Sequence, residues 1–160
     1  MVTLQKYNFT HFPYLDYRLD AEQDRFTAIV PAALERVEQR NLRGDFLAVP
    51  VTVFFNGAPA GFFILDFGND KLDLSENPDS ALLRSLSINP KFQGKGVGKM
   101  AMLQIPQLLH QYFPKTTEIV LAVNEQNTVA ARLYEKCGYG LSPKTRVGRS
   151  GLQRIMTKYL

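Results

Sequence analysis

The sequence predicts a mixed α/β (α+β) fold, in which helices pack on one β-sheet. Short runs rich in Val, Ile, Leu and Phe alternate along the chain with longer segments of helical period. The length of 160 residues suits one domain, 1–160, with a substantial hydrophobic core. Hydrophobic residues make up 45% of the chain and charged residues 21%, which is typical of a folded rather than a disordered protein.

The first half of the chain is predicted to contain three strands and a helical region. The strands are expected at 2–7, 47–55 and 60–67, and the helical region at 13–38 with a loop at 41–44. Pro31 predicts two short helices rather than one, because proline interrupts the backbone hydrogen bonds of a helix. Asn56-Gly57 indicates a hairpin between the second and third strands, and Pro59 predicts a turn longer than two residues.

The second half is predicted to alternate between strands and helices, bounded by glycines and prolines. Strands are expected at 82–88, 119–123 and 152–160, and loops at 68–80 and 142–151. A helix of about 18 residues is expected from Gly94 to near Pro114. A second helix is expected at 127–136, with Gly138 as its C-terminal stop signal.

Cysteine and histidine content argues against disulfide and metal sites. Cys137 is the only cysteine, so no intramolecular disulfide can form, and it is expected to be a small buried hydrophobe. His11 and His110 have no partner at metal-ligand spacing, and no metal is predicted. This cysteine usage indicates a cytoplasmic protein. No apolar run reaches the roughly 20 residues of a membrane-spanning helix, and no signal peptide or membrane partner is predicted.

The net charge of +4 suits an anionic ligand but is too small to indicate nucleic-acid binding. Lysines and arginines are spread along the chain, and no basic tract is interleaved with aromatic residues. A nucleic-acid partner is therefore not predicted.

A glycine-rich turn carries the strongest chemical signal in the sequence. Gly94, Gly96 and Gly98 follow a predicted strand and open a predicted helix. Glycines let the backbone turn tightly and let a ligand approach, and the free N–H groups at a helix N-terminus attract anions. Lys95 and Lys99 add positive charge. The turn is typical of a phosphate or pyrophosphate site, although a helix start that only permits tight packing fits these residues too.

Two better-known phosphate motifs do not fit this turn. A Walker motif needs Ser or Thr after Gly98-Lys99, and Met100 stands there. A dinucleotide fingerprint needs glycine three residues after Gly96, and that position is Lys99. Nucleotide hydrolysis and NAD chemistry are therefore not supported.

The surroundings of the turn resemble the acetyl-CoA motif of the GNAT superfamily of N-acetyltransferases. The run Leu86–Gly98 (LSINPKFQGKGVG) is similar to a strand, a proline-containing turn and Gln/Arg-x-x-Gly-x-Gly/Ala opening a helix. The run Asn127–Tyr139 (NTVAARLYEKCGY) is similar to the family's Asn-x-x-Ala-x-x-Leu-Tyr-x-x-x-Gly-Phe element. The resemblance implies a mostly antiparallel mixed sheet of about six to seven strands. It also implies an enzyme that uses acetyl-CoA as co-substrate and an amine as acceptor.

The resemblance also implies where acetyl-CoA binds. The pyrophosphate is expected on the N–H groups from Gln93 to Lys99, and the pantetheine arm along the preceding strand. Asn127 is expected to contact the amide groups of the co-substrate. The predicted binding residues are Leu86, Ser87, Ile88, Gln93, Gly94, Lys95, Gly96, Val97, Gly98, Lys99 and Asn127.

Tyr134 is the predicted catalytic residue, as a general acid for the departing CoA thiolate. A phenol with a pKa near 10 suits this task if it lies within about 3 Å of the sulfur. Asn127 lies seven residues earlier, so both side chains are expected on one side of the helix. Glu22, Asp24 and Asp66 are candidate general bases, but each is expected to be a solvated surface carboxylate instead, and no base is assigned.

Other questions stay open at this stage. A non-catalytic acyl-CoA-binding regulatory module on the same fold is the alternative function, although such a module does not require Tyr134. The acceptor is either a small-molecule amine or a protein or peptide amine, and the protein is a monomer or homodimer. The acidic cluster Asp16, Asp20, Glu22 and Asp24 either attracts a cationic amine or is the solvated face of a helix.

Overall fold

The computed structural model describes residues 1–160 and contains a seven-stranded sheet of order β1-β2-β3-β4-β5-β7-β6. All neighbouring strands are antiparallel except β4 and β5, which are parallel. The strands are β1 (Val2–Lys6), β2 (Ala48–Phe55), β3 (Ala58–Asp66), β4 (Ser80–Ile88), β5 (Glu118–Asn124), β6 (Gly140–Gly148) and β7 (Gly151–Tyr159). The predicted mixed, mostly antiparallel sheet is confirmed.

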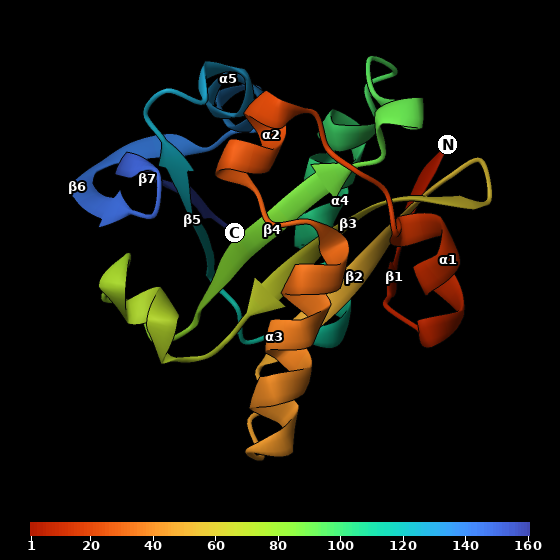
Figure 1. The fold of residues 1–160 in the computed structure, drawn as a ribbon. Helices are drawn as coiled ribbons and strands as arrows, with labels where there is room; N and C mark the ends of the chain where they lie inside the picture. The colour runs from red at the N-terminus through yellow and green to blue at the C-terminus, as the bar shows by residue number, and fades with distance from the viewer.

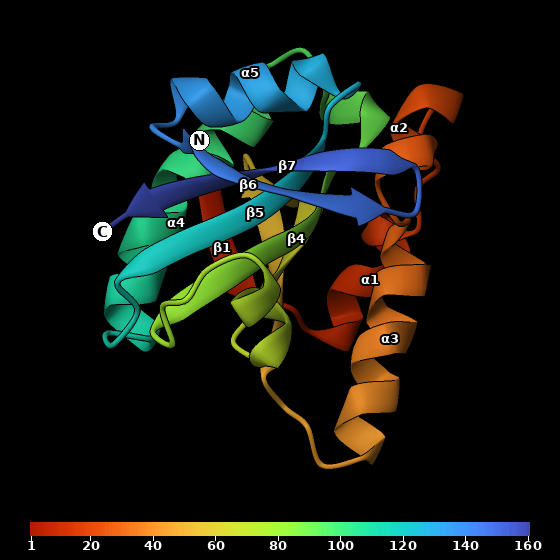
Figure 2. The same cartoon turned by 90° about the vertical axis from the view of Figure 1, so that its left-hand side faces the viewer.

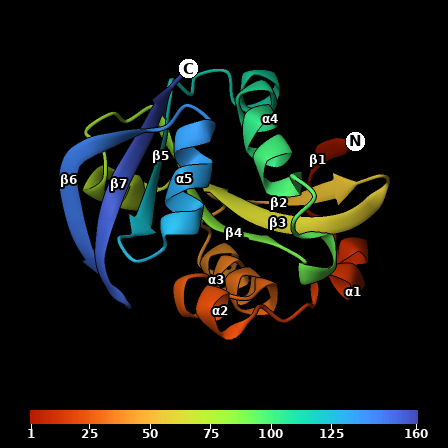
Figure 3. The same ribbon diagram turned by 90° about the horizontal axis from the view of Figure 1, so that it is seen from above.

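Helices cover both faces of the sheet (Figures 1 and 3). On one side lie α1 (Phe12–Leu15), α2 (Ala21–Phe26) and α3 (Val30–Leu42), which are seen together in Figure 2. On the other side lie α4 (Val97–Tyr112) and α5 (Thr128–Lys136). The larger part of the core lies under α4 and includes Cys137, which is 2% exposed as expected for a small buried hydrophobe. None of the helices combines the length and the apolar character needed to cross a bilayer.

The helical region after β1 contains three helices rather than the two predicted. Pro31 does not interrupt a helix but lies in the first turn of α3. Proline is tolerated there because the N–H groups of the first turn have no partner within the helix. Because α3 extends to Leu42, it also includes part of the predicted loop at 41–44.

The hairpin between β2 and β3 is tighter than predicted. Asn56 and Gly57 alone form the turn, with φ of 49° and 82°, and Phe55 pairs with Ala58. Two positive φ angles are typical of the tight hairpin turns that Asn-Gly favours. Pro59 lies within β3 beside an irregularity in the strand register, where a missing N–H is tolerated.

The predicted loop at 142–151 is wrong, because most of it belongs to β6. This strand is at the edge of the sheet and pairs only with β7. Most of its residues are exposed, so its sequence does not show the alternation of a half-buried strand. The loop predicted at 68–80 contains a short 3-10 helix, Asn69–Asp73.

The sheet opens between β4 and β5. These strands pair only over three residues, from Ser80–Glu118 to Leu82–Val120, and then diverge (Figure 1). Ser85 has a φ of 59°, which a residue other than glycine seldom adopts, and lies where the pairing of β4 with β3 is irregular. As a result, the second half of β4 faces an opening rather than another strand.

Candidate active site

The glycine turn lies between β4 and α4, as the sequence predicted. Gly94 and Gly96 have φ of 75° and 77°, and Gly96 is the N-cap of α4. No atom lies within 4 Å of the position that a Cβ would take at either residue. These two glycines therefore allow a left-handed backbone beside open space and do not serve close packing.

This open space belongs to a cavity of about 580 Å³, which we call the turn cavity. It contains all but one of the predicted binding residues together with Tyr134: Leu86, Ser87, Ile88, Gln93, Gly94, Gly96, Val97, Gly98, Lys99 and Asn127. Lys95 does not line the cavity, and its ammonium lies 5.9 Å from the centre of the Phe92 ring. Asp20 and Glu22 of the helical region also line it.

Two polar contacts, which sequence reasoning missed, connect the N-terminal helical region to this cavity. The Tyr17 hydroxyl lies 2.7 Å from Ser87 Oγ and donates to the Ser87 carbonyl at 3.1 Å. The side chains of Gln23 and Gln93 bond reciprocally, with N–O distances of 3.0 and 3.2 Å. The two residues of each contact are 70 positions apart in the sequence, so no local pattern indicates these contacts. They hold α2 and its preceding segment against β4 and the turn.

Tyr134 lies on α5, and Asn127 is the N-cap of this helix; both residues line the turn cavity. Asn127 caps the helix by accepting the Ala130 N–H at 3.3 Å. The Tyr134 hydroxyl makes no hydrogen bond within the chain, and its ring centre lies 6.0 Å from that of Tyr139. Burial raises the pKa of Tyr134 to about 12, with a smaller contribution from Cys137. The phenol is therefore protonated at neutral pH and available to a ligand.

A second cavity of about 510 Å³ lies in the opening between β4 and β5. It shares five lining residues with the turn cavity: Phe26, Thr27, Leu86, Asn127 and Tyr134. Tyr134 therefore lies at the junction of two cavities. The two cavities are therefore adjacent at these shared residues.

Arginine dominates the charge of this second cavity, which we call the arginine cavity. Its five arginines are Arg25 of α2, Arg36 of α3, Arg84 of β4, Arg146 of β6 and Arg149 of the β6–β7 turn. No Asp, Glu, His or Lys lines it. Sequence reasoning missed this cluster because its members are scattered over five segments and no local motif joins them.

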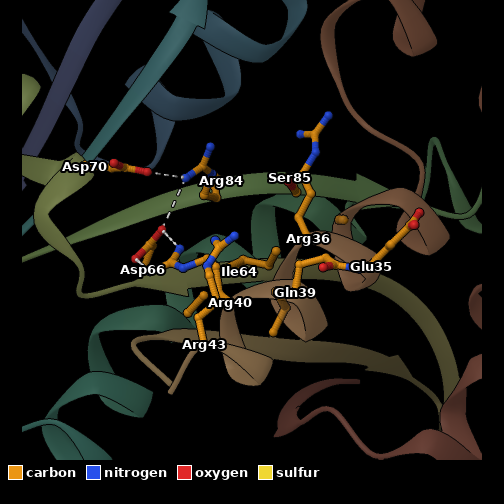
Figure 4. A pocket seen from close by; sticks show the side chains of 13 residues that line it. Glu35, Arg36, Gln39, Arg40, Arg43, Ile64, Asp66, Asp70, Arg84 and Ser85 are labelled. Atoms are coloured by element: carbon orange, nitrogen blue, oxygen red, sulfur yellow. Dashed lines mark hydrogen bonds and ion pairs between the residues drawn. The ribbon is translucent and has the colours of Figure 1, made fainter. Parts of the chain in front are cut away.

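The structure does not support Asp66 as a general base. Its buried carboxylate accepts from Arg40 Nη1 at 2.6 Å and from Arg84 Nη1 at 3.2 Å, beside a third cavity (Figure 4). Burial by itself would raise the pKa of Asp66, but the hydrogen bonds from Arg40 and the Gly68 N–H outweigh it and hold the pKa below its usual range. A carboxylate held in its charged form by two arginines is a poor proton acceptor.

The other two candidate bases lie outside the arginine cavity as well. Glu22 lines the turn cavity, and Asp24 lines neither cavity. Asp20 caps α2 by accepting a hydrogen bond from the Gln23 N–H at 2.8 Å. Glu22 and Asp24 lie in the first turn of α2, where negative charge interacts favourably with the helix dipole. Three members of the acidic cluster thus lie at the start of α2, whereas Asp16 is the C-cap of α1.

Comparison with known proteins identifies the family. The family model described as the acetyltransferase (GNAT) family matches residues 11–139. The chain belongs to the GNAT family. Membership confirms the enzyme class predicted from the sequence, an acetyl-CoA-dependent N-acetyltransferase with acetyl-CoA as co-substrate. The uncharacterized N-acetyltransferase YbbJ of Bacillus subtilis (strain 168) is 35% identical over 161 residues, which cover 99% of this GNAT chain and 98% of that protein.

Solved structures share the GNAT fold at low sequence identity. The aminoglycoside acetyltransferase AAC(6')-Ib in complex with coenzyme A and kanamycin aligns with a TM-score of 0.79 and 19% identity, over 99% of this chain and 95% of that one. The spermidine N-acetyltransferase of Vibrio cholerae in complex with CoA and spermine aligns with a TM-score of 0.72 and 16% identity, over 99% and 95%. Both likenesses confirm the predicted fold.

Proposed function

We propose that this GNAT enzyme transfers an acetyl group from acetyl-CoA to a primary amine, which attacks directly while both substrates are bound. The position of Tyr134, where the turn cavity meets the arginine cavity, carries this proposal. The turn cavity holds the donor and the arginine cavity holds the acceptor. The shared residues are the one place at which an amine reaches a thioester without leaving its own cavity.

The turn cavity fits the chemical groups of acetyl-CoA, which supplies the acetyl thioester. The N–H groups of the turn and the N-terminus of α4 suit the pyrophosphate, and a Cβ at Gly94 or Gly96 would occupy this open side. The free edge of β4 at Leu86 to Ile88 suits the pantetheine arm as an added strand. A backbone N–H on this edge polarises the thioester carbonyl as negative charge develops on its oxygen.

Tyr134 acts as the general acid in this proposal. The amine loses one proton on forming its bond to the carbonyl carbon, and the CoA sulfur gains one on leaving. The Tyr134 hydroxyl has no partner in the chain to compete for its proton, so it is free to donate to the sulfur. Asn127, the N-cap of the same helix, offers its unpaired amide N–H groups to the co-substrate.

Release of free CoA is the direct test of the activity. The purified protein, given acetyl-CoA and a panel of primary amines, is expected to release CoA at a rate that depends on the amine. Acetyl-CoA is expected to raise the melting temperature, whereas ATP and NAD are not. Thermal stabilisation by acetyl-CoA without turnover of any amine would instead indicate a non-catalytic module. The cytoplasmic location and the oligomeric state, monomer or homodimer, stay predictions.

The glycine turn offers a prediction about affinity. Gly96→Ala is expected to weaken acetyl-CoA binding about tenfold or more, because the new Cβ occupies the phosphate side of the turn. The left-handed φ of Gly96 also strains alanine, at a cost of about 1 to 2 kcal/mol of stability. Calorimetric titration with acetyl-CoA and urea unfolding measure the two effects.

A matched control separates strain from ligand contact. The control is Gly57→Ala. Gly57 lies in the β2–β3 turn, has a φ of 82° and has an equally open Cβ position. This variant is expected to lose similar stability but to keep its affinity for acetyl-CoA. Equal affinity losses in both variants would show that the turn acts only through stability.

The raised pKa of Tyr134 predicts the alkaline side of the pH profile. A general acid is lost as the pH rises through its pKa, and burial raises that pKa from 10 to about 12. With both substrates saturating, kcat is therefore expected not to fall between pH 9 and about 10.5. A fall centred near pH 10 that is absent from Tyr134→Phe would show that the phenol titrates at its ordinary value.

A further inference from the structure

We infer that the acceptor is a small primary amine that carries its own anionic group, a carboxylate or a phosphate. This inference rests on the proposed function, because it names the substrate class of the same site. It follows from the charge of the arginine cavity, whose lining contains five arginines and no acidic residue.

These arginines are largely free of acidic partners within the chain. Only Arg84 is ion-paired, to Asp66 at 3.2 Å and to Asp70 at 3.4 Å. Arg25, Arg36, Arg146 and Arg149 form no salt bridge. Arg146 is half-buried, and Arg25, Arg36 and Arg149 are exposed, so solvent screens part of their mutual repulsion. Four guanidinium groups around one cavity without an acidic partner still favour an anion there.

Arg36 has no acidic partner, whereas Arg40, which lines the cavity beside Asp66, is ion-paired. Arg40, one helical turn further along α3, binds Asp45 at 2.8 Å and Asp66 at 2.6 Å. In Figure 4 the Arg36 side chain extends past Ser85, and its guanidinium points away from the Asp66 cluster. The planar fork of a guanidinium fits a carboxylate or a phosphate with two parallel hydrogen bonds.

The arginines also offer a way to deprotonate the acceptor amine in a cavity that contains no general base. An amine must be neutral to attack, and most alkylamines are protonated at neutral pH. Nearby positive charge disfavours the ammonium form and lowers the pKa of the bound amine. The arginines therefore attract the anionic part of the acceptor and favour the reactive form of its nitrogen. A polycationic acceptor gains nothing from such a cavity.

The arginines are not needed to bind the phosphates of the donor. None of the five lines the turn cavity, where the glycine turn, the α4 N-terminus and Lys99 lie. The residues shared by the two cavities include no arginine. Of these two cavities, only the one on the acceptor side of Tyr134 is lined by arginines.

Matched pairs of acceptors test the inference with the wild-type enzyme. An amino acid is compared with its carboxamide, and an aminoalkyl phosphate with the corresponding amino alcohol, with a polyamine as the cationic arm. We expect kcat/KM about tenfold or more higher for the anionic member of at least one pair, and this pair identifies the anion. Equal or faster turnover of neutral or cationic amines overturns the inference but leaves acetyl transfer intact. No turnover of any amine overturns both proposals.

Arginine variants test which residues bind the anion. Arg36→Gln and Arg149→Gln are expected to raise KM for the preferred anionic acceptor about tenfold while KM for acetyl-CoA stays within about twofold. Arg36→Gln is also expected to move the amine-dependent limb of the kcat profile to higher pH, because the bound ammonium becomes less unfavourable.

Arg43→Gln is the control, since this exposed residue follows α3 and does not line the arginine cavity. It is expected to keep wild-type kinetics. A rise in KM for acetyl-CoA rather than for the acceptor in Arg36→Gln and Arg149→Gln would assign the arginines to the donor and overturn the inference.

Discussion

Replacing Tyr134 with phenylalanine is expected to lower kcat about a hundredfold or more while KM for acetyl-CoA changes less than about twofold. The variant loses only the hydroxyl at the junction of the two cavities, and a well-placed general acid contributes on the order of 10² to 10⁴ in rate. Steady-state kinetics with the best acceptor from the amine panel measures both constants.

Tyr139→Phe is the matched control for this loss. The Tyr139 hydroxyl is buried without a hydrogen-bond partner, and its ring lies beside that of Tyr134. Removing an unpaired buried hydroxyl is expected to leave kcat unchanged and stability unchanged or slightly higher. If Tyr134→Phe turns over at the wild-type rate with every amine, Tyr134 is not the general acid.

Asp66→Asn is expected to destabilise the protein by about 3 kcal/mol. The Asp66 carboxylate is fully buried and the Arg40 side chain is only 19% exposed, so the substitution leaves a largely buried positive charge with only the more exposed Asp45 as a partner. The free energy of unfolding from urea titration at neutral pH measures the effect. Asp70→Asn is the comparison, because Asp70 is 67% exposed and its pairing with Arg84 should contribute less than about 1 kcal/mol.

The contribution of Asp66 should also depend on pH in a defined direction. Its folded-state pKa lies below its unfolded value, so its stabilisation is present above the unfolded pKa of about 3.9 and is lost as the pH falls through the folded pKa. The difference in stability between wild type and Asp66→Asn should therefore shrink below about pH 4. If the folded Asp66→Asn variant lost catalysis as well, Asp66 would have a role at the site that its position does not indicate.

The features that the sequence predicted correctly are encoded by neighbouring residues. The glycine turn and the end of α5 near Gly138 each lie within one short segment. Their backbone angles and hydrogen bonds follow from the residue types themselves. This is why the glycine turn and the end of α5 could be predicted before the fold was known, whereas their role in binding acetyl-CoA stays a proposal.

The features that the sequence did not predict depend on contacts between distant segments. β6 is a strand because β7 returns beside it, and its exposed residues need no apolar alternation. Asp66 is ion-paired because α3 brings Arg40 next to the end of β3. The arginine cavity gathers residues from Arg25 to Arg149, so its charge exists only in the folded chain.

The divergence of β4 and β5 leaves a free strand edge that is protected from pairing with strands of other molecules. An unpaired strand edge normally invites a strand from another molecule, which leads to aggregation. The free edge of β4 does not lie on the rim of the sheet but within the opening, with α2 and α5 on either side (Figure 3). A recess of this kind admits a single extended chain and excludes a whole foreign sheet. The enzyme can therefore keep this unpaired edge, where we propose that the pantetheine arm binds, without exposing a template for fibril growth.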